Sequence, residues 1–135
     1  MTYLLLTYLD EKAWLSLSKD EQQQIIAEGL PHVQHLVASG KFLSGAPLAP
    51  ASTAALVRVR DGQRLVTDGP FAETREQVGG YTLIDAQDRD EAIAIAAGFL
   101  GPGSQACIEV RAVQELDATF GLGLSISRRP VRHNV

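Results

Sequence analysis

The fold is decided by the central stretch Thr67-Asp68-Gly69-Pro70-Phe71-Ala72-Glu73-Thr74-Arg75-Glu76-Gln77-Val78-Gly79-Gly80-Tyr81, which lies between two strand-like runs. The step Asp68-Gly69-Pro70 is a strong turn signal, because glycine accepts a positive φ, proline fixes its own φ, and aspartate bonds forward to the backbone. Gly79-Gly80 lets another backbone or a ligand approach a strand closely. We therefore predict a turn after Thr67 and a strand from Gly80 to Asp85.

Two interpretations of this stretch remain open. In the first, Asp68 caps the turn, Phe71 fills the core and the two glycines mark a β-bulge; turn chemistry accounts for most of the residues in this way. In the second, the same residues form part of a binding site.

The composition is that of one globular domain. The chain has 135 residues, of which 45% are hydrophobic and 21% charged, so it can bury a sizeable core. It contains no apolar run long enough for a membrane span, and its first residues lack a basic leader and a cleavage site, so we expect a cytoplasmic protein without a membrane partner. The net charge of −4 argues against nucleic acid as a partner.

Cysteine and motif content narrow the chemistry further. Cys107 is the single cysteine, so the chain has no internal disulfide, and its alternating strand context predicts a small core side chain. No glycine loop has the strand-to-helix context of a nucleotide-binding fingerprint, and no serine elbow is present. We expect no cofactor.

The first half of the chain predicts a strand followed by a long helix. Residues 2–9 are apolar and β-rich, and residues 10–17 form a connection with a short helical turn anchored by Trp14. Ser18 and Glu21 form a capping box at the start of a helix that runs to about residue 39. Gly29 and Pro31 interrupt its apolar stripe, so we expect a kink or two helices end to end.

The second half predicts six further elements. A short strand covers residues 42–48, and Asp61-Gly62 is the strongest hairpin signal in the chain, joining strands at 53–60 and 63–67. After the strand at 80–85, Asp88 and Glu91 begin a second helix that ends before Gly101. Residues 106–113 alternate again and predict a last strand.

These elements predict an α+β fold of the ferredoxin-like class. With the hairpin treated as an insertion, the order is β-α-β-β-α-β. Two helices cover only one face of such a sheet, so the other face needs a second cover. A second copy of the chain supplies it most simply, and we predict a homodimer. The segment 117–135 is weakly patterned and reads as a C-terminal extension that is flexible or crosses to the partner.

Several separated motifs resemble the DGPF subgroup of the YCII-related family. They are the opening Tyr3-Leu4-Leu5-Leu6, Ser18-Lys19-Asp20-Glu21, Val57-Arg58-Val59-Arg60-Asp61-Gly62, the stretch from Asp68 to Tyr81, Leu83-Ile84-Asp85-Ala86, Asp90-Glu91-Ala92 and Glu109-Val110-Arg111. The resemblance covers residues 1–116 and implies a dimeric α+β barrel. It also implies a His-Asp pair in a cleft, but the family's histidine position falls on Gly29 and its aspartate loop on residues 47–53, which hold no carboxylate.

The nearest substitutes for that pair are His32 and Asp68. A histidine beside a carboxylate is a suitable general base, because the carboxylate fixes the tautomer and stabilises the charged form. His35 lies three residues further on, so the two histidines could share a metal, although a third ligand is lacking and we predict no metal site. Both could equally be helix surface residues.

Four more residues complete the predicted site. Tyr8, Phe71 and Tyr81 are candidate walls of a small-molecule cleft between sheet and helices, and Arg58 is a candidate for orienting an anion. Core packing for the aromatic rings and solvent exposure for the arginine are the alternatives. Two functions follow. One is an enzyme-like or ligand-binding dimer that uses His32 and Asp68. The other is a non-catalytic binding or regulatory module, which the resemblance links to transcription because relatives look like neighbours of alternative sigma factors.

Overall fold

The computed structural model describes residues 1–69 and 76–123. The elements run in the order β1 (Thr2–Leu9), α1 (Glu11–Ser16), α2 (Lys19–Ala38), β2 (Phe42–Pro47), the 3₁₀ turn η1 (Ala51–Thr53), β3 (Ala55–Arg60), β4 (Gln63–Asp68), β5 (Gln77–Asp85), α3 (Arg89–Gly98), β6 (Cys107–Ala112) and α4 (Leu116–Phe120). The predicted order of strands and long helices is confirmed. The short helix α4 was not predicted.

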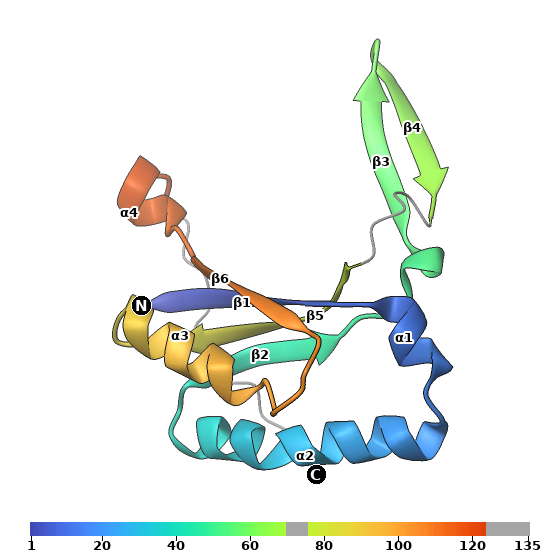
Figure 1. The fold of residues 1–135 in the computed structure, drawn as a ribbon. Coiled ribbons are helices and arrows are strands. Elements are labelled where there is room, and N and C mark those ends of the chain that lie inside the picture. Colours follow the sequence, from blue (N-terminus) through green and yellow to red (C-terminus); the bar gives the residue numbers. More distant parts are fainter. Residues whose placement is uncertain (70–75, 124–135) are drawn as a thin grey trace.

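Four strands form one antiparallel sheet in the order β2-β5-β1-β6. Helices α2 and α3 lie on the same side of this sheet (Figure 1). Without the hairpin β3–β4, the element order is β-α-β-β-α-β with the first and third core strands in the centre, which agrees with the predicted ferredoxin-like α+β fold.

The core lies between the sheet and these two helices. Alternation along β1 places Tyr3 and Leu5 on the helix side, and Ile84 of β5 pairs with Tyr3 there and is completely buried. Leu36 of α2 and Ile95 of α3 close the core from the other side. Leu4 and Leu6 point to the opposite face, which no helix of the described residues covers, and are only half-buried.

Helix α2 is a single element of 20 residues, so the expectation of two helices end to end is wrong. The predicted capping box is present, since the Ser18 hydroxyl accepts from the Glu21 amide at 3.1 Å and the Glu21 carboxylate accepts from the Ser18 amide at 3.1 Å. Pro31 removes one backbone donor, but its side chain is on the exposed surface while Leu36 stays packed. Packing of the sheet-facing side holds the helix together across the proline.

The hairpin β3–β4 is confirmed and forms a separate two-stranded sheet. Its turn residues Asp61 and Gly62 both have positive φ, 53° and 76°, as a type I′ turn requires. The hairpin stands away from the four-stranded sheet on the side opposite α2 (Figure 1).

The central stretch is a strand for longer than predicted. β5 begins at Gln77, three residues before Gly80, and pairs with β1 through a register shift between Thr7 and Tyr8. Gly79 is the additional residue at this shift, so the glycines mark a β-bulge. Phe71 lies outside the described residues, as does Pro70 of the predicted turn, whereas Asp68 is the last residue of β4.

Cys107 is exposed, so its predicted place in the core is wrong. The residue is paired with Tyr8 at the end of the edge strand β6, on the face that the helices leave uncovered. Alternation along β6 was recognised correctly, but it places Ile108 and Val110 against the core instead.

Candidate ligand cavity

A cavity of about 1030 Å³ lies between the sheet and helices α1 and α2. Its walls come from α1 through Trp14, from α2 through Ile25 and Gly29, and from the loop that joins α3 to β6. Its floor is formed by strands β1, β2 and β5. A space of this size is typical of sites for small organic molecules.

The cavity exists because half of α2 makes no close contact with the sheet. The sheet-facing stripe of this helix continues from Leu36 and Val33, which pack on the core, to Gly29 and Ile25, which line the cavity. A Cβ atom at Gly29 would meet no other atom within 4 Å. Ile25 is 49% exposed and its neighbour Ile26 is 64% exposed, although both face this space.

The floor is smooth because of glycines in the strands. A Cβ atom at Gly45 of β2 would lie 3.0 Å from the Tyr81 carbonyl oxygen, and one at Gly80 of β5 would lie 3.2 Å from the Ala46 carbonyl oxygen. At both glycines, the backbone of the neighbouring strand lies close to the place where a side chain would begin. The absence of side chains there widens the cavity above them.

Charged groups in the described lining are all acidic. The carboxylates of Asp10 and Glu28 belong to it, and among residues 1–69 and 76–123 no lysine, arginine or histidine does. Asp10 also caps α1, accepting from the Ala13 amide at 3.1 Å. The lining is otherwise mainly apolar, with a few hydroxyl groups such as those of Ser16 and Thr82.

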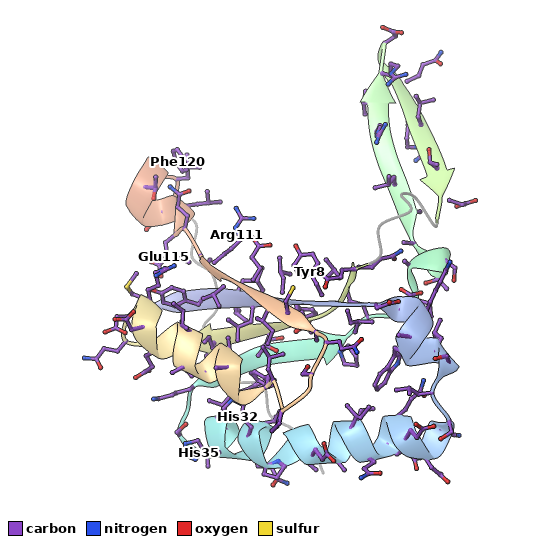
Figure 2. All side chains as sticks on the ribbon, viewed as in Figure 1. Tyr8, His32, His35, Arg111, Glu115 and Phe120 are labelled. Carbon is purple, nitrogen blue, oxygen red and sulfur yellow. The ribbon has the colours of Figure 1, made fainter. Side chains whose placement is uncertain are left out.

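Of the predicted cleft walls, the structure places Tyr81 in this lining and Tyr8 elsewhere. The strand register pairs Tyr81 with Leu6, so its ring belongs to the uncovered face and its backbone to the cavity floor. Tyr8 also lies on the uncovered face, with Arg111 near it (Figure 2). Its hydroxyl donates to Glu109 Oε1 at 2.8 Å.

This hydrogen bond to Glu109 raises the pKa of Tyr8, with smaller contributions from desolvation and from the negative charge of the same carboxylate. The bond exists only while the phenol keeps its proton. Cys107 is close by, and desolvation followed by the Glu76 carboxylate raises the pKa of its thiol. The Cys107 Sγ donates to Glu76 Oε2 at 3.6 Å.

His32 is a packing residue between α2 and α3. Its Nε2 lies 2.9 Å from the Ile95 carbonyl oxygen, and its ring meets that of Phe99 edge to face with centroids 4.6 Å apart. A Cβ atom at Gly98 would collide with the imidazole ring, so this glycine is what allows the two helices to approach. Figure 2 shows His32 and His35 on α2.

The predicted pair of His32 and Asp68 is not formed within one chain. Asp68 ends β4, where it is paired with Ala55, and β4 and α2 lie on opposite sides of the four-stranded sheet (Figure 1). Arg58 also belongs to the hairpin and is exposed. The described residues contain no group of three or more histidine, cysteine, aspartate or glutamate side chains that could hold a metal ion.

The sequence contained a signal for the cavity that motif reasoning overlooked. Gly29 was interpreted as an interruption of the α2 stripe, but its place between Ile25 and Val33 at helical spacing puts it on the sheet-facing side. A glycine in the middle of an apolar stripe costs helix stability and leaves space against the partner layer. Trp14, which was predicted to anchor the connection at residues 10–17, forms part of the cavity wall.

Comparison with known proteins supplies the relationship. The YCII-related domain model matches residues 1–117. The chain belongs to the YCII-related family. An uncharacterised protein of Rhizobium meliloti (strain 1021) is 38% identical to this YCII-related chain over 96 residues, which are 71% of the chain and 77% of that protein. In the part of the chain that is described, no helix is both long and apolar enough to cross a membrane.

Proposed function

We propose that this YCII-related protein, a member of the DGPF-containing subgroup, is a cytoplasmic homodimer that binds a small apolar molecule in the cavity between α1, α2 and the sheet. The observation that carries the proposal is the pair Ile25 and Ile26, which are 49% and 64% exposed beside an apolar space of about 1030 Å³. Apolar side chains left beside a preformed space gain free energy when a ligand removes them from water.

The charge of the lining selects the class of ligand. Two carboxylates and no cationic side chain among the described lining residues oppose an anion and favour a neutral or positively charged molecule. Trp14 adds an aromatic wall, which attracts cations through its π face. The proposed ligand therefore has an apolar body and a hydroxyl or amine group, and carboxylates or phosphates are disfavoured.

The proposal concerns binding and does not use His32 as a base. The imidazole Nε2 is engaged with the Ile95 carbonyl oxygen, and the ring meets that of Phe99 edge to face. A general base must reach the proton that it removes. His32 instead fixes the position of α2 relative to α3, and so the position of one cavity wall.

The homodimer is supported by the uncovered face of the sheet. Leu4 and Leu6 of β1 face the same way as Tyr81 and Leu83 of β5, and all four are only half-buried in a single chain. A second copy of the same face would bury this apolar centre. The cavity lies on the helix side of the sheet, so ligand binding and dimer formation use different surfaces.

The test is a fluorescence titration with the neutral probe N-phenyl-1-naphthylamine, followed by displacement with decylamine, decanol and decanoate. We expect the probe to bind, and decanol and decylamine to displace it more effectively than decanoate. In Gly29→Leu the isobutyl group would occupy the cavity, so probe binding should be lost. Ala27→Leu is the matched control, because Ala27 is on the same helix, is exposed and does not line the cavity.

Protein stability separates a blocked site from a damaged fold. Replacing Gly29 by leucine improves helix propensity by about 0.8–1.0 kcal/mol, so the variant should unfold at the same denaturant concentration as the wild type or a higher one. Absence of probe binding to the wild type, or equal binding to both leucine variants, would contradict the proposed site.

A further inference from the structure

The hairpin β3–β4 exposes an apolar surface that no other described part of the chain covers. All twelve residues of its two strands are exposed, and the strands pair only with each other. An isolated two-stranded hairpin is marginally stable in water, because it has no layer to pack against. The two strands are nevertheless paired regularly, from Ala55 with Asp68 to Arg60 with Gln63. We therefore expect another surface to pack on the hairpin and stabilise it.

One face of the hairpin carries its three valines, beside Ala55, Arg64 and Asp68, whereas Leu56 and Leu65 lie on the opposite face. Val57 is paired directly with Val66, and Val59 lies on the same face beside them. These side chains are 64%, 57% and 74% exposed, respectively. Three β-branched side chains together on one face form a patch whose burial would release structured water and stabilise the hairpin.

A second apolar surface lies at the other end of the molecule. Helix α4 and the residues after it expose Phe120 (59%) and Leu122 (60%). The hairpin and α4 rise from the same side of the four-stranded sheet, at opposite ends, on either side of the uncovered face (Figure 1). Figure 2 shows Phe120 at the top of α4 on this side.

We propose that the β3–β4 hairpin is a dimer arm whose valine face packs on the α4 segment of a second copy of the chain. This inference rests on the proposed homodimer and extends it. When two uncovered sheet faces stack about a twofold axis that crosses the strands, the hairpin end of one copy lies over the α4 end of the other. The contact then occurs twice, as a closed symmetric dimer requires.

The distribution of charge also favours a second copy of the chain as the partner of the hairpin. Residues 55–68 contain three arginines and two aspartates, a net charge of +1, which leaves −5 for the remainder of a chain whose net charge is −4. A basic arm and an acidic body attract each other between two copies, and they orient the encounter. An anionic membrane or a nucleic acid is a less suitable partner, because the acidic remainder of the chain would repel it.

The test is site-directed cross-linking in a Cys107→Ser background. Chains carrying Val59→Cys are mixed with chains carrying Phe120→Cys and treated with a short bis-maleimide. We expect a covalent dimer that contains one chain of each kind. Arg58→Cys replaces Val59→Cys in the matched control, because Arg58 is on the opposite face of the same strand and should give little product. A dominant Val59–Val59 product would overturn the inference, since the arms would then meet each other.

Sedimentation of variants supplies the second readout. Val66→Asp should raise the dimer dissociation constant by at least about tenfold, since it buries a charge in the contact, whereas Thr67→Asp on the other face should change it little. A wild-type dimer with no loss of affinity in Val66→Asp and no mixed cross-link would overturn the arm but leave the dimer in place. A monomeric wild type at micromolar concentration would overturn the proposed dimer itself.

Discussion

At the level of single residues, the contact between Gly98 and His32 determines how closely the two long helices approach. The space for a Cβ at Gly98 is filled by the imidazole ring. We expect Gly98→Ala to lower the free energy of unfolding by about 1–3 kcal/mol, because the ring must move away from Phe99 and the Ile95 carbonyl oxygen. Urea denaturation measures the change. Gly101→Ala is the control, since a Cβ there meets nothing within 4 Å, and an equal effect of both substitutions would contradict the role of the contact.

A second residue-level prediction concerns Tyr8 and Glu109. The hydrogen bond raises the folded-state pKa of Tyr8 above the ordinary value of about 10. Its stabilising effect is therefore complete below the unfolded pKa and is lost as the pH rises through the folded one. Glu109→Gln should lower the pKa of Tyr8. That pKa is measured by a pH titration of the absorbance at 295 nm in Glu109→Gln, from which the titration of the double variant Glu109→Gln/Tyr8→Phe is subtracted to leave the signal of Tyr8. Asp90→Asn, on α3, should leave that pKa unchanged.

Sequence reasoning succeeded for individual residues where the signal was local. The capping box at Ser18 and the hairpin turn at Asp61-Gly62 depend only on neighbouring atoms, and both were predicted correctly. Tyr8 could not be placed in the same way. Residues 4–6 of β1 are all leucine, so the sequence does not show which face of the strand the helices cover. The sequence therefore does not decide whether Tyr8 or Thr7 lies on the helix side.

At the level of the elements, one half of α2 packs on the core and the other half borders the cavity. Gly29 is not required by any close contact, unlike Gly98, and its φ is not positive. We therefore expect Gly29→Ala to raise the free energy of unfolding by about 0.5–1 kcal/mol through helix propensity. Gly40→Ala should lower it, because Gly40 ends the same helix with φ of 74°. Thermal unfolding of both variants measures the difference, and a destabilised Gly29→Ala would show that the cavity wall is more tightly packed than described.

The individual elements were easier to predict from the sequence than their arrangement relative to one another. The hairpin follows from Asp61-Gly62 and alternation on either side, but nothing local indicates that it forms its own sheet. The predicted pairing of His32 with Asp68 failed within one chain for this reason. The hairpin that carries Asp68 stands on the side of the sheet opposite α2, which carries His32 (Figure 1).

For the whole molecule, the distribution of exposed apolar groups gives the two faces of the sheet different roles. The helix face contains the core and the cavity, where Ile25 and Ile26 are exposed to the proposed small ligand. The uncovered face, the hairpin and α4 lie together on the other side and form the surface of the proposed dimer. A ligand in the cavity would therefore leave the dimer surface unobstructed, and the two kinds of binding can be measured independently.

Cys107 provides a reporter for the uncovered face of the whole molecule. It is exposed in a single chain and paired with Tyr8 on that face. Alkylation by iodoacetamide at pH 8.5 should therefore slow several-fold as the protein concentration rises through the dimer dissociation constant, because a second copy covers the thiol. Glu76→Gln should speed alkylation of the monomer, since the carboxylate raises the pKa of the thiol and reduces the reactive thiolate. A rate that is independent of protein concentration, in a sample that sedimentation shows to be dimeric, would mean that the chains associate through another surface.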